Sequence, residues 1–226
     1  MSRIDVWLVE QGHFSSRQAA KRAIRAGHVK VNGIPVKPSK RVTESDYIVV
    51  STVLQNHPVG YMKLGEIENA LGGNLLPDSI NLALDIGSSA GGFLAYLGEL
   101  NIPAIGIEVS DEFIDTLEKL VESYPSVSIL IDDAFTLEPS TICEEGTLDL
   151  LLVDVTTEPD GTLKLIERFS NLMRKGGRLV AAFKFRSTPE TIAELHNQVS
   201  ELGFVDIINL TLDKSRQEVH IVCIRQ

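Results

Sequence analysis

The chain has 226 residues, of which 43% are hydrophobic and 23% charged, and its net charge at pH 7 is −10. This composition is typical of a globular protein, and no apolar run approaches the roughly 18 residues that a membrane-spanning helix needs. Two distant cysteines, Cys143 and Cys223, and five histidines without metal-ligand spacing argue against a disulfide framework and a zinc site, so we expect no metal.

The charge is divided unevenly along the chain. Residues 1–52 hold nine Lys or Arg against four Asp or Glu, a balance of +5, and the remainder holds 12 basic against 27 acidic residues, a balance of −15. Such asymmetry predicts a basic module that binds a polyanion, attached to an acidic body. The first residues lack the pattern of a signal peptide, so we expect a cytoplasmic protein without membrane contact.

The first predicted helix lies in "SSRQAAKRAIRAG", where Ser15 is placed to cap the helix with Gln18, and Gly27 to end it. Basic residues at four-residue steps give this helix a basic face. In the following "VKVNG", Val29 and Val31 alternate with a lysine before Asn32-Gly33, which predicts a hairpin with a type I′ turn, and a third strand is expected over residues 47–50.

Residues 2–50, with the basic helix, its glycine stop and "VKVNG", resemble the S4 domain, a small RNA-binding module. A basic helix beside a hairpin can contact several phosphates, which gives affinity and orientation but little base specificity. We therefore expect structured RNA as the partner, with contacts from Arg17, Lys21, Arg22, Arg25 and Lys30.

We predict an S4 RNA-binding domain over residues 1–52, a linker over 53–61 and a second domain over 62–226. From residue 80 onward, strand-like and amphipathic helical runs alternate, which predicts an open, mostly parallel α/β sheet covered by helices on both faces. The segment between the last two strand-like runs, 204–210 and 218–224, is too short for a helical crossover, so these strands should be antiparallel.

The stretch "LALDIGSSAGGF" lies where the first strand of this sheet turns into its helix, the place at which open sheets bind ligands. Its glycines, Gly87, Gly91 and Gly92, allow a tight turn and a close approach of backbone to ligand. Asp85 at the strand end would repel a pyrophosphate and attract a cation, such as the amino acid part of S-adenosylmethionine.

Two further strand ends carry acids. Glu108 lies 23 residues beyond Asp85, close to the spacing of about 20 that is typical of an acid binding ribose hydroxyls. Asp133 ends the third strand, where it could accept from an adenine amino group, and Asp132 is the alternative. Residues 80–226 resemble the Rossmann-like methyltransferases. This resemblance implies S-adenosylmethionine as cofactor, bound by Asp85, Gly87, Ser88, Gly91, Gly92, Phe93, Glu108, Asp132, Asp133 and Asp154.

Four residues are candidates for chemistry on a ribose hydroxyl, which needs a base to become a nucleophile. Lys63 begins the second domain, Asp154 and Lys184 end the fourth and fifth strands, and Glu218 opens the last strand. They resemble the Lys-Asp-Lys-Glu tetrad of FtsJ-like ribose 2′-O-methyltransferases. Together with the S4 domain, the chain resembles the TlyA family of ribosomal RNA 2′-O-methyltransferases, which is also called hemolysin A-like.

The resemblance implies an RNA methyltransferase that acts on ribosomal RNA or a ribosomal subunit, with Lys184 as the base. The segments after Asp154 and Lys184, "DVTTEPDG" and "FKFRS", depart from the family pattern, and "HPVGYMKLG" around Lys63 lacks the family's Ser-Arg pair. The alternative is therefore a non-catalytic RNA-binding protein with a degenerate methyltransferase domain. A nicotinamide-dependent oxidoreductase is disfavoured by Asp85 and by the glycine spacing.

Overall fold

A computed structural model describes residues 2–14, 17–25, 28–43, 45–50, 58–76, 79–213 and 216–226, and it does not describe the side chains of residues 18, 19, 22 and 25. The chain divides into two compact units, Met1–Met62 and Lys63–Gln226. The expected helix cap Ser15, the stop Gly27 and most of the expected linker lie outside the described residues.

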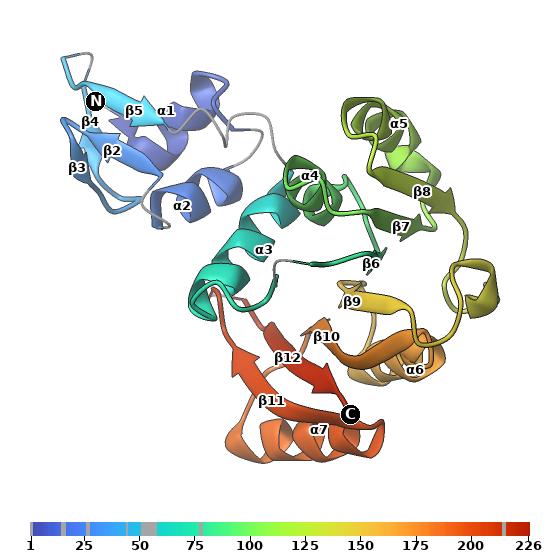
Figure 1. The fold of residues 1–226 in the computed structure, drawn as a ribbon. Helices are drawn as coiled ribbons and strands as arrows, with labels where there is room; N and C mark the ends of the chain where they lie inside the picture. The colour runs from blue at the N-terminus through green and yellow to red at the C-terminus, as the bar shows by residue number, and fades with distance from the viewer. Residues whose placement is uncertain are drawn as a thin grey trace. The chain divides into compact units, whose positions relative to one another are not determined.

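The first unit is a small α+β module with two short sheets (Figure 1). Strand β2 lies between β3 and β5 and pairs antiparallel with both, and β1 pairs with β4. The predicted hairpin is confirmed, because Val31 pairs with Ile34 and both Asn32 and Gly33 have the positive φ that a type I′ turn requires. The elements are β1 (Ser2–Arg3), α1 (Ile4–Glu10), α2 (Arg17–Arg25), β2 (Val29–Val31), β3 (Ile34–Pro35), β4 (Arg41–Val42) and β5 (Ile48–Val50).

The second unit carries a seven-stranded sheet of order β11-β12-β10-β9-β6-β7-β8. The strands from β10 to β8 in that order are parallel, while β12 lies antiparallel between β10 and β11, as the short final connection predicts. The strands are β6 (Ala83–Ile86), β7 (Ala104–Glu108), β8 (Val127–Ile131), β9 (Leu148–Val153), β10 (Met173–Phe183), β11 (Phe204–Leu210) and β12 (Val219–Arg225).

Helices cover both faces of this sheet (Figure 1). Helix α3 begins at Val59, so its first turn lies inside the segment expected to be a linker. Because alternate residues of a strand point to opposite faces, the positions of β6, β9 and β12 sort into one face toward α3 and α4 and one toward α6 and α7. The helices are α3 (Val59–Ala70), α4 (Gly92–Glu99), α5 (Ile114–Ser123), α6 (Pro159–Ser170) and α7 (Pro189–Glu201).

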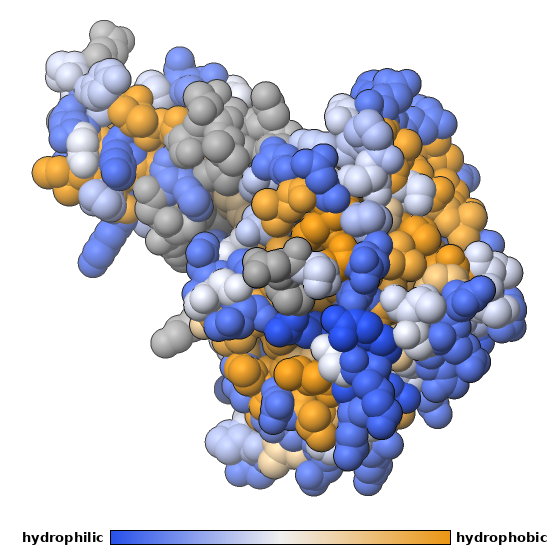
Figure 2. All heavy atoms as spheres, viewed as in Figure 1, coloured by the Kyte–Doolittle hydropathy of each residue, from blue (hydrophilic) through white to orange (hydrophobic). Residues whose placement is uncertain are grey.

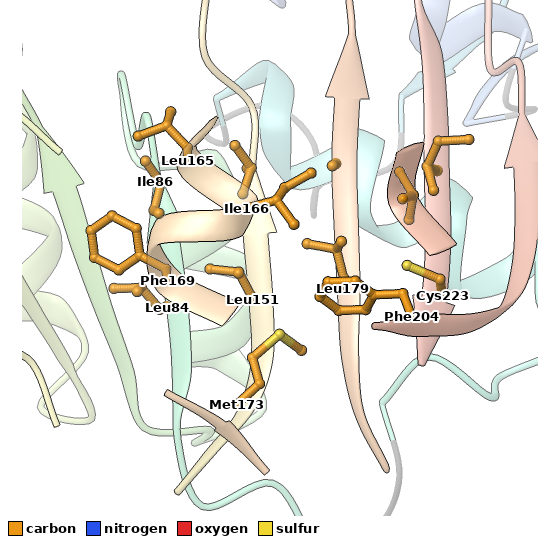
Figure 3. Packing of buried hydrophobic residues seen from close by; sticks show 14 of the residues in the cluster. Leu84, Ile86, Leu151, Leu165, Ile166, Phe169, Met173, Leu179, Phe204 and Cys223 are labelled. Carbon is orange, nitrogen blue, oxygen red and sulfur yellow. The ribbon is translucent and has the colours of Figure 1, made fainter. Parts of the chain in front are cut away.

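The main core lies between the sheet and helices α6 and α7 (Figure 3). Leu84 and Leu151 point to it from the central strands, and Phe169 of α6 packs on them with no exposed surface. Burial of a side chain of this size contributes about 2–3 kcal/mol, which holds the strands in register. Asp149 holds the start of β9 in place, because its carboxylate accepts from the backbone amides of Asn81 and Leu82 and pairs with Arg174. Since the strands from β10 to β8 are parallel, their carboxyl ends lie at one edge of the sheet.

Candidate functional site

Four residues from distant parts of the chain meet at the carboxyl edge of the sheet. Lys63 Nζ, from α3, lies 2.6 Å from Asp154 Oδ2 and 3.0 Å from Glu218 Oε1. Lys184 Nζ, after β10, lies 3.3 Å from the other oxygen of Asp154. The two lysines and two carboxylates therefore alternate in charge in one connected array, which we call the tetrad, and which holds all four predicted catalytic positions.

The environment of Lys63 keeps it protonated. Burial lowers the pKa of this amine, but the negative charges of Asp154 and Glu218 outweigh burial and raise the pKa above its usual value. Burial likewise raises the pKa of Glu218, while the contact with His220 and the charge of Lys63 overcome it and lower the pKa to about 2. Lys63 is thus a fixed cation between two fixed anions at neutral pH.

Lys184 is held differently. Its Nζ donates to the backbone carbonyl of Val155 at 2.8 Å and to Thr156 Oγ1 at 3.3 Å. Its side chain is 30% exposed, against 10% for Lys63. The amine is therefore the member of the tetrad that is both oriented by neighbours and open to a reactant.

A cavity of about 440 Å³ opens beside the tetrad, at the carboxyl ends of β6, β7, β8 and β9. Its size is within the range of about 300–1,000 Å³ that is usual for small-molecule sites. Hydrophobic side chains gather at the surface over β7 and β8 (Figure 2). Among the described residues that line the cavity are Gly87, Glu108, Val109, Asp132, Asp133, Ala134, Phe135, Asp154, Val155 and Thr156.

The acids predicted for ribose and adenine binding lie in this lining. Glu108 is buried and accepts from the backbone amides of Ser89 at 2.7 Å and Ser110 at 2.8 Å, which fix its carboxylate. Each of its oxygens keeps a second lone pair for a hydroxyl donor. Asp133 Oδ1 accepts from the backbone amide of Phe135 at 2.9 Å. The wall of the cavity therefore offers acceptors at fixed positions.

Sequence reasoning misses the apolar part of the lining. Val109 and Phe135 follow the strand-end acids directly and remain 67% and 43% exposed, although each is large and hydrophobic. Exposed apolar side chains that flank a cavity are typical of a surface that packs on a flat ring. The available signal is the position of these residues, one or two places beyond the acids.

Asp85 lies beneath the glycine-rich turn and does not line the cavity. It is 1% exposed, and neither carboxylate oxygen has a hydrogen-bond partner among the described residues. Ser88 donates its hydroxyl to the backbone carbonyl of Asp85 instead. Burial raises the pKa of Asp85 to about 7, and the charges of Asp154 and Glu108 act in the same direction. The charge of Lys63 acts in the opposite direction but does not outweigh burial.

The other predicted residues of the turn differ in their surroundings. A Cβ on Gly87 would lie 2.8 Å from the backbone oxygen of Asp154, so glycine lets this turn pack against the end of β9. A Cβ on Gly91 would meet Leu120 of α5 rather than the cavity. Gly92 and Phe93 begin α4 and are buried. Gly91, Gly92 and Phe93 therefore shape the turn from below.

In the first unit, a buried acid that sequence reasoning misses organises the predicted basic residues. Asp5 has no exposed surface, and its oxygens lie 2.9 Å from Arg3 Nε, 3.1 Å from Arg17 Nη2 and 3.9 Å from Lys21 Nζ. Burial raises the pKa of Asp5, but these arginines outweigh burial and hold the pKa below its usual value. Three cations share one anion, which leaves a net positive cluster.

The remaining predicted RNA contacts are only partly described. Lys30 is exposed on β2 between two buried valines. The side chains of Arg22 and Arg25 lie outside the described part of the chain.

Among the described residues, no helix is long and apolar enough to span a membrane. Over the same residues, there is no group of three or more His, Cys, Asp or Glu side chains arranged to hold a metal ion.

Comparisons with protein families and with known proteins show what the two parts of the chain are similar to. Residues 2–48 match the S4 domain. Over 159 residues the chain is 30% identical to the 16S/23S rRNA (cytidine-2′-O)-methyltransferase TlyA of Mycobacterium tuberculosis, covering 69% of this chain and 57% of that protein. It is 36% identical over 96 residues to the putative rRNA methyltransferase YqxC of Bacillus subtilis, covering 40% and 32% of the two chains. The chain thus spans little more than half the length of its M. tuberculosis relative.

Solved structures show the same fold at lower identity. A putative hemolysin from Streptococcus thermophilus matches with a TM-score of 0.59 at 19% identity, over all of this chain and 88% of that one. The Methanococcus jannaschii fibrillarin pre-rRNA processing protein matches with a TM-score of 0.60 at 18% identity, over 82% and 81% of the two chains. A SAM dependent methyltransferase from Archaeoglobus fulgidus matches with a TM-score of 0.54 at 14% identity, over 73% of this chain and 94% of that one, so the sheet has the fold of such methyltransferases.

Proposed function

We propose that this chain, an S4-domain protein of the TlyA-like family, is an S-adenosylmethionine-dependent RNA ribose 2′-O-methyltransferase. The observation that carries the proposal is the tetrad, in which Lys184 lies 3.3 Å from Asp154, a residue that also lines a ligand-sized cavity. A cavity alone would fit many enzymes. A lysine held at its edge by a carboxylate, with a second lysine neutralising that carboxylate, suits the removal of a proton from a hydroxyl.

The residues present fit S-adenosylmethionine. Glu108 is placed to accept from its ribose hydroxyls, and Asp133 or the adjacent Asp132 from its adenine amino group. Val109 and Phe135 offer apolar surface to the adenine ring. The unpartnered carboxyl of Asp85, below the turn, supplies negative charge for the cationic amino acid end.

When bound, this cofactor supplies an electrophilic methyl group, and the protein must align and deprotonate the acceptor. We assign the base to Lys184, whose Nζ must first lose a proton to the solvent and then, as the neutral amine, accepts the proton of the 2′-hydroxyl. Val155 and Thr156 orient that nitrogen. Lys63 remains protonated and neutralises the charge of Asp154. The Asp154 carboxylate can therefore orient Lys184 without holding Lys184 in its protonated form. In the tetrad, Lys184 is thus the base, and Lys63 is the cation that positions Lys184 through Asp154.

We assign RNA binding to the S4 unit. Its cluster of Arg3, Arg17 and Lys21 around Asp5, together with Lys30, can contact phosphates of structured RNA. The named activity of the M. tuberculosis relative supports ribosomal RNA, free or in a subunit, as the substrate. A stacked target nucleotide would have to turn outward to bring its hydroxyl to Lys184.

Calorimetry with S-adenosylmethionine, followed by transfer of a labelled methyl group to total ribosomal RNA, tests this function. We expect binding and transfer by the full chain. Lys184→Ala should keep the binding affinity within about threefold and reduce transfer at least about 100-fold, because general-base catalysis contributes 10²–10⁴-fold. Lys119→Ala, at an exposed position on α5, is the matched control and should keep both. Binding without transfer by the full chain would instead favour a non-catalytic RNA-binding protein, which the altered segments after Asp154 and Lys184 make a specific alternative.

A further inference from the structure

His220 lies one position from the strand residues that fill the main core, yet on the other face of the sheet. It belongs to β12, where it pairs with Ala182 of β10 on one side and Leu210 of β11 on the other. Val219 and Ile221 join the core beneath α6 and α7. By the alternation of a strand, His220 shares its face with Glu218 and is turned toward the tetrad.

The surroundings of this imidazole give it one polar neighbour. His220 is 1% exposed, and its Nε2 lies 3.3 Å from Glu218 Oε1. That same oxygen lies 3.0 Å from Lys63 Nζ. Neither Nδ1 nor Nε2 forms a hydrogen bond in the part of the chain that the structure describes, so the 3.3 Å approach of Nε2 to Glu218 Oε1 is a close polar contact without hydrogen-bond geometry. A buried polar group with an unmade hydrogen bond costs about 1–3 kcal/mol, so a hydrophobic residue here would be expected to be more stable.

We propose that His220 is a positioning residue of the tetrad, whose Nε2, 3.3 Å from Glu218 Oε1, holds the Glu218 carboxylate in place and, through it, Lys63. The proposal rests on the proposed function, since it assigns a role within that site. The Glu218 side chain has three rotatable bonds, so its carboxylate can turn away from Lys63 unless a neighbour holds it. His220 Nε2 and Lys63 Nζ both approach the same oxygen, Oε1.

A movement of the Glu218 carboxylate would affect Lys184 through three contacts in series. Glu218 and Asp154 hold Lys63 from two sides, at 3.0 and 2.6 Å, and Asp154 then meets Lys184 at 3.3 Å. If Glu218 turns away, Lys63 keeps one anion only, and it draws Asp154 away from Lys184. A displacement of about 1 Å at a reacting group can cost about 100-fold in rate. Loss of an outer partner typically costs about 10–100-fold.

Two substitutions separate positioning from packing. His220→Gln places an N–H donor within reach of the position of Nε2, whereas His220→Leu fills the space without a donor. We expect kcat of His220→Leu to fall about tenfold or more with KM for S-adenosylmethionine and RNA within about twofold, and His220→Gln to stay within about threefold of the parent. His220→Leu should melt at or above the parent temperature, because it removes a buried polar group. His196→Leu, in α7 and away from the tetrad, is the matched histidine control and should keep kcat.

A second readout does not depend on turnover. Amine-acylating reagents label neutral lysines, and the labelling of each lysine can be followed by mass spectrometry. We expect Lys63 to become at least about threefold more reactive in His220→Leu, with Lys119 unchanged, and to remain protected in His220→Gln. If the full chain transfers no methyl group, the proposed function fails, and this labelling alone decides the role of His220. Equal kcat in parent and Leu variant, equal slowing in both variants, or unchanged Lys63 labelling overturns the inference.

Discussion

At the scale of single residues, the site contains one buried acid that the folded chain leaves unpaired. Asp85 sits under the glycine-rich turn, and no described group donates to its carboxylate. Asp149, which is also buried and lies on the neighbouring strand β9, has Arg174 and two backbone amides as partners. Burial raises the pKa of Asp149, but these partners outweigh burial and hold it below its usual value. The two acids should therefore affect stability in opposite ways.

The pH dependence follows from the sign of each shift. Burial raises the folded-state pKa of Asp85 to about 7, above the ordinary aspartate value of 3.8. Its contribution to stability is thus fully present below pH 4 and is lost as the pH rises toward 7, by a few kcal/mol in total at about 1.4 kcal/mol per pH unit. Asp149 contributes above its unfolded-state pKa, and its contribution is lost as the pH falls through the folded-state value.

We predict that Asp85→Asn stabilises the free protein relative to the parent by an amount that grows from pH 4 to pH 7 and then levels. The reason is that the variant avoids an unpaired buried carboxylate. It should also bind S-adenosylmethionine less tightly. Urea unfolding at several pH values measures the first effect, and calorimetry the second. Asp149→Asn is the control and should destabilise at pH 7. Similar destabilisation by both variants at pH 8 would show that Asp85 has a partner.

At the scale of elements, the turn between β6 and α4 depends on glycine for two separate reasons. Gly91 has φ +75°, and a Cβ there would lie 2.5 Å from Leu120 Cδ1. Gly146 has φ +71° but nothing within 4 Å of such a Cβ. The pair separates the cost of a left-handed backbone from the cost of a steric clash with α5.

Gly146→Ala should lower the free energy of unfolding by about 1 kcal/mol, the cost of placing alanine in the left-handed region. Gly91→Ala should lower it by about 2–4 kcal/mol, because Leu120 must move as well. Denaturant midpoints at constant m-value measure both. Equal losses in the two variants would mean that α5 yields freely to the added methyl group, and the turn would then be less constrained than the contacts indicate.

Much of this architecture could be predicted from local patterns. The pair Asn32-Gly33 has few solutions other than a type I′ hairpin, and the short connection before β12 leaves only antiparallel pairing. Helix α1 is not among the predicted elements, because seven residues give too little periodicity to distinguish a helix. The early start of α3 escapes for another reason, since Pro58 and Gly60 are typical of a linker but Pro is also favoured at the start of a helix.

The site is less accessible to such reasoning. Residues at strand ends can be placed at one edge, so the meeting of Asp154 and Lys184 follows from topology. Whether a strand-end acid points into a cavity or under a loop depends on tertiary packing, which is why Asp85 and Glu108 differ. His220 escapes because it occupies an ordinary position in a strand, and only the contact with Glu218 distinguishes it.

At the scale of the whole molecule, the basic unit and the acidic unit use their charged residues in different ways. The basic unit has a buried acid, Asp5, that gathers cations which would otherwise repel one another. The acidic unit uses carboxylates at the strand ends as acceptors in a cavity. Each unit alone supports a common activity, RNA binding or ligand binding. Their presence in one chain supports the combination, a methyl group delivered to RNA.

The measurement that tests this account most directly is a map of 2′-O-methylated positions in ribosomal RNA from cells with and without the gene for this chain. We predict that one or a few positions lose the methyl group in its absence, that the parent gene restores them, and that the Lys184→Ala gene does not, although its product accumulates and binds S-adenosylmethionine. The same map in all three cells, or restoration by Lys184→Ala, would contradict the account.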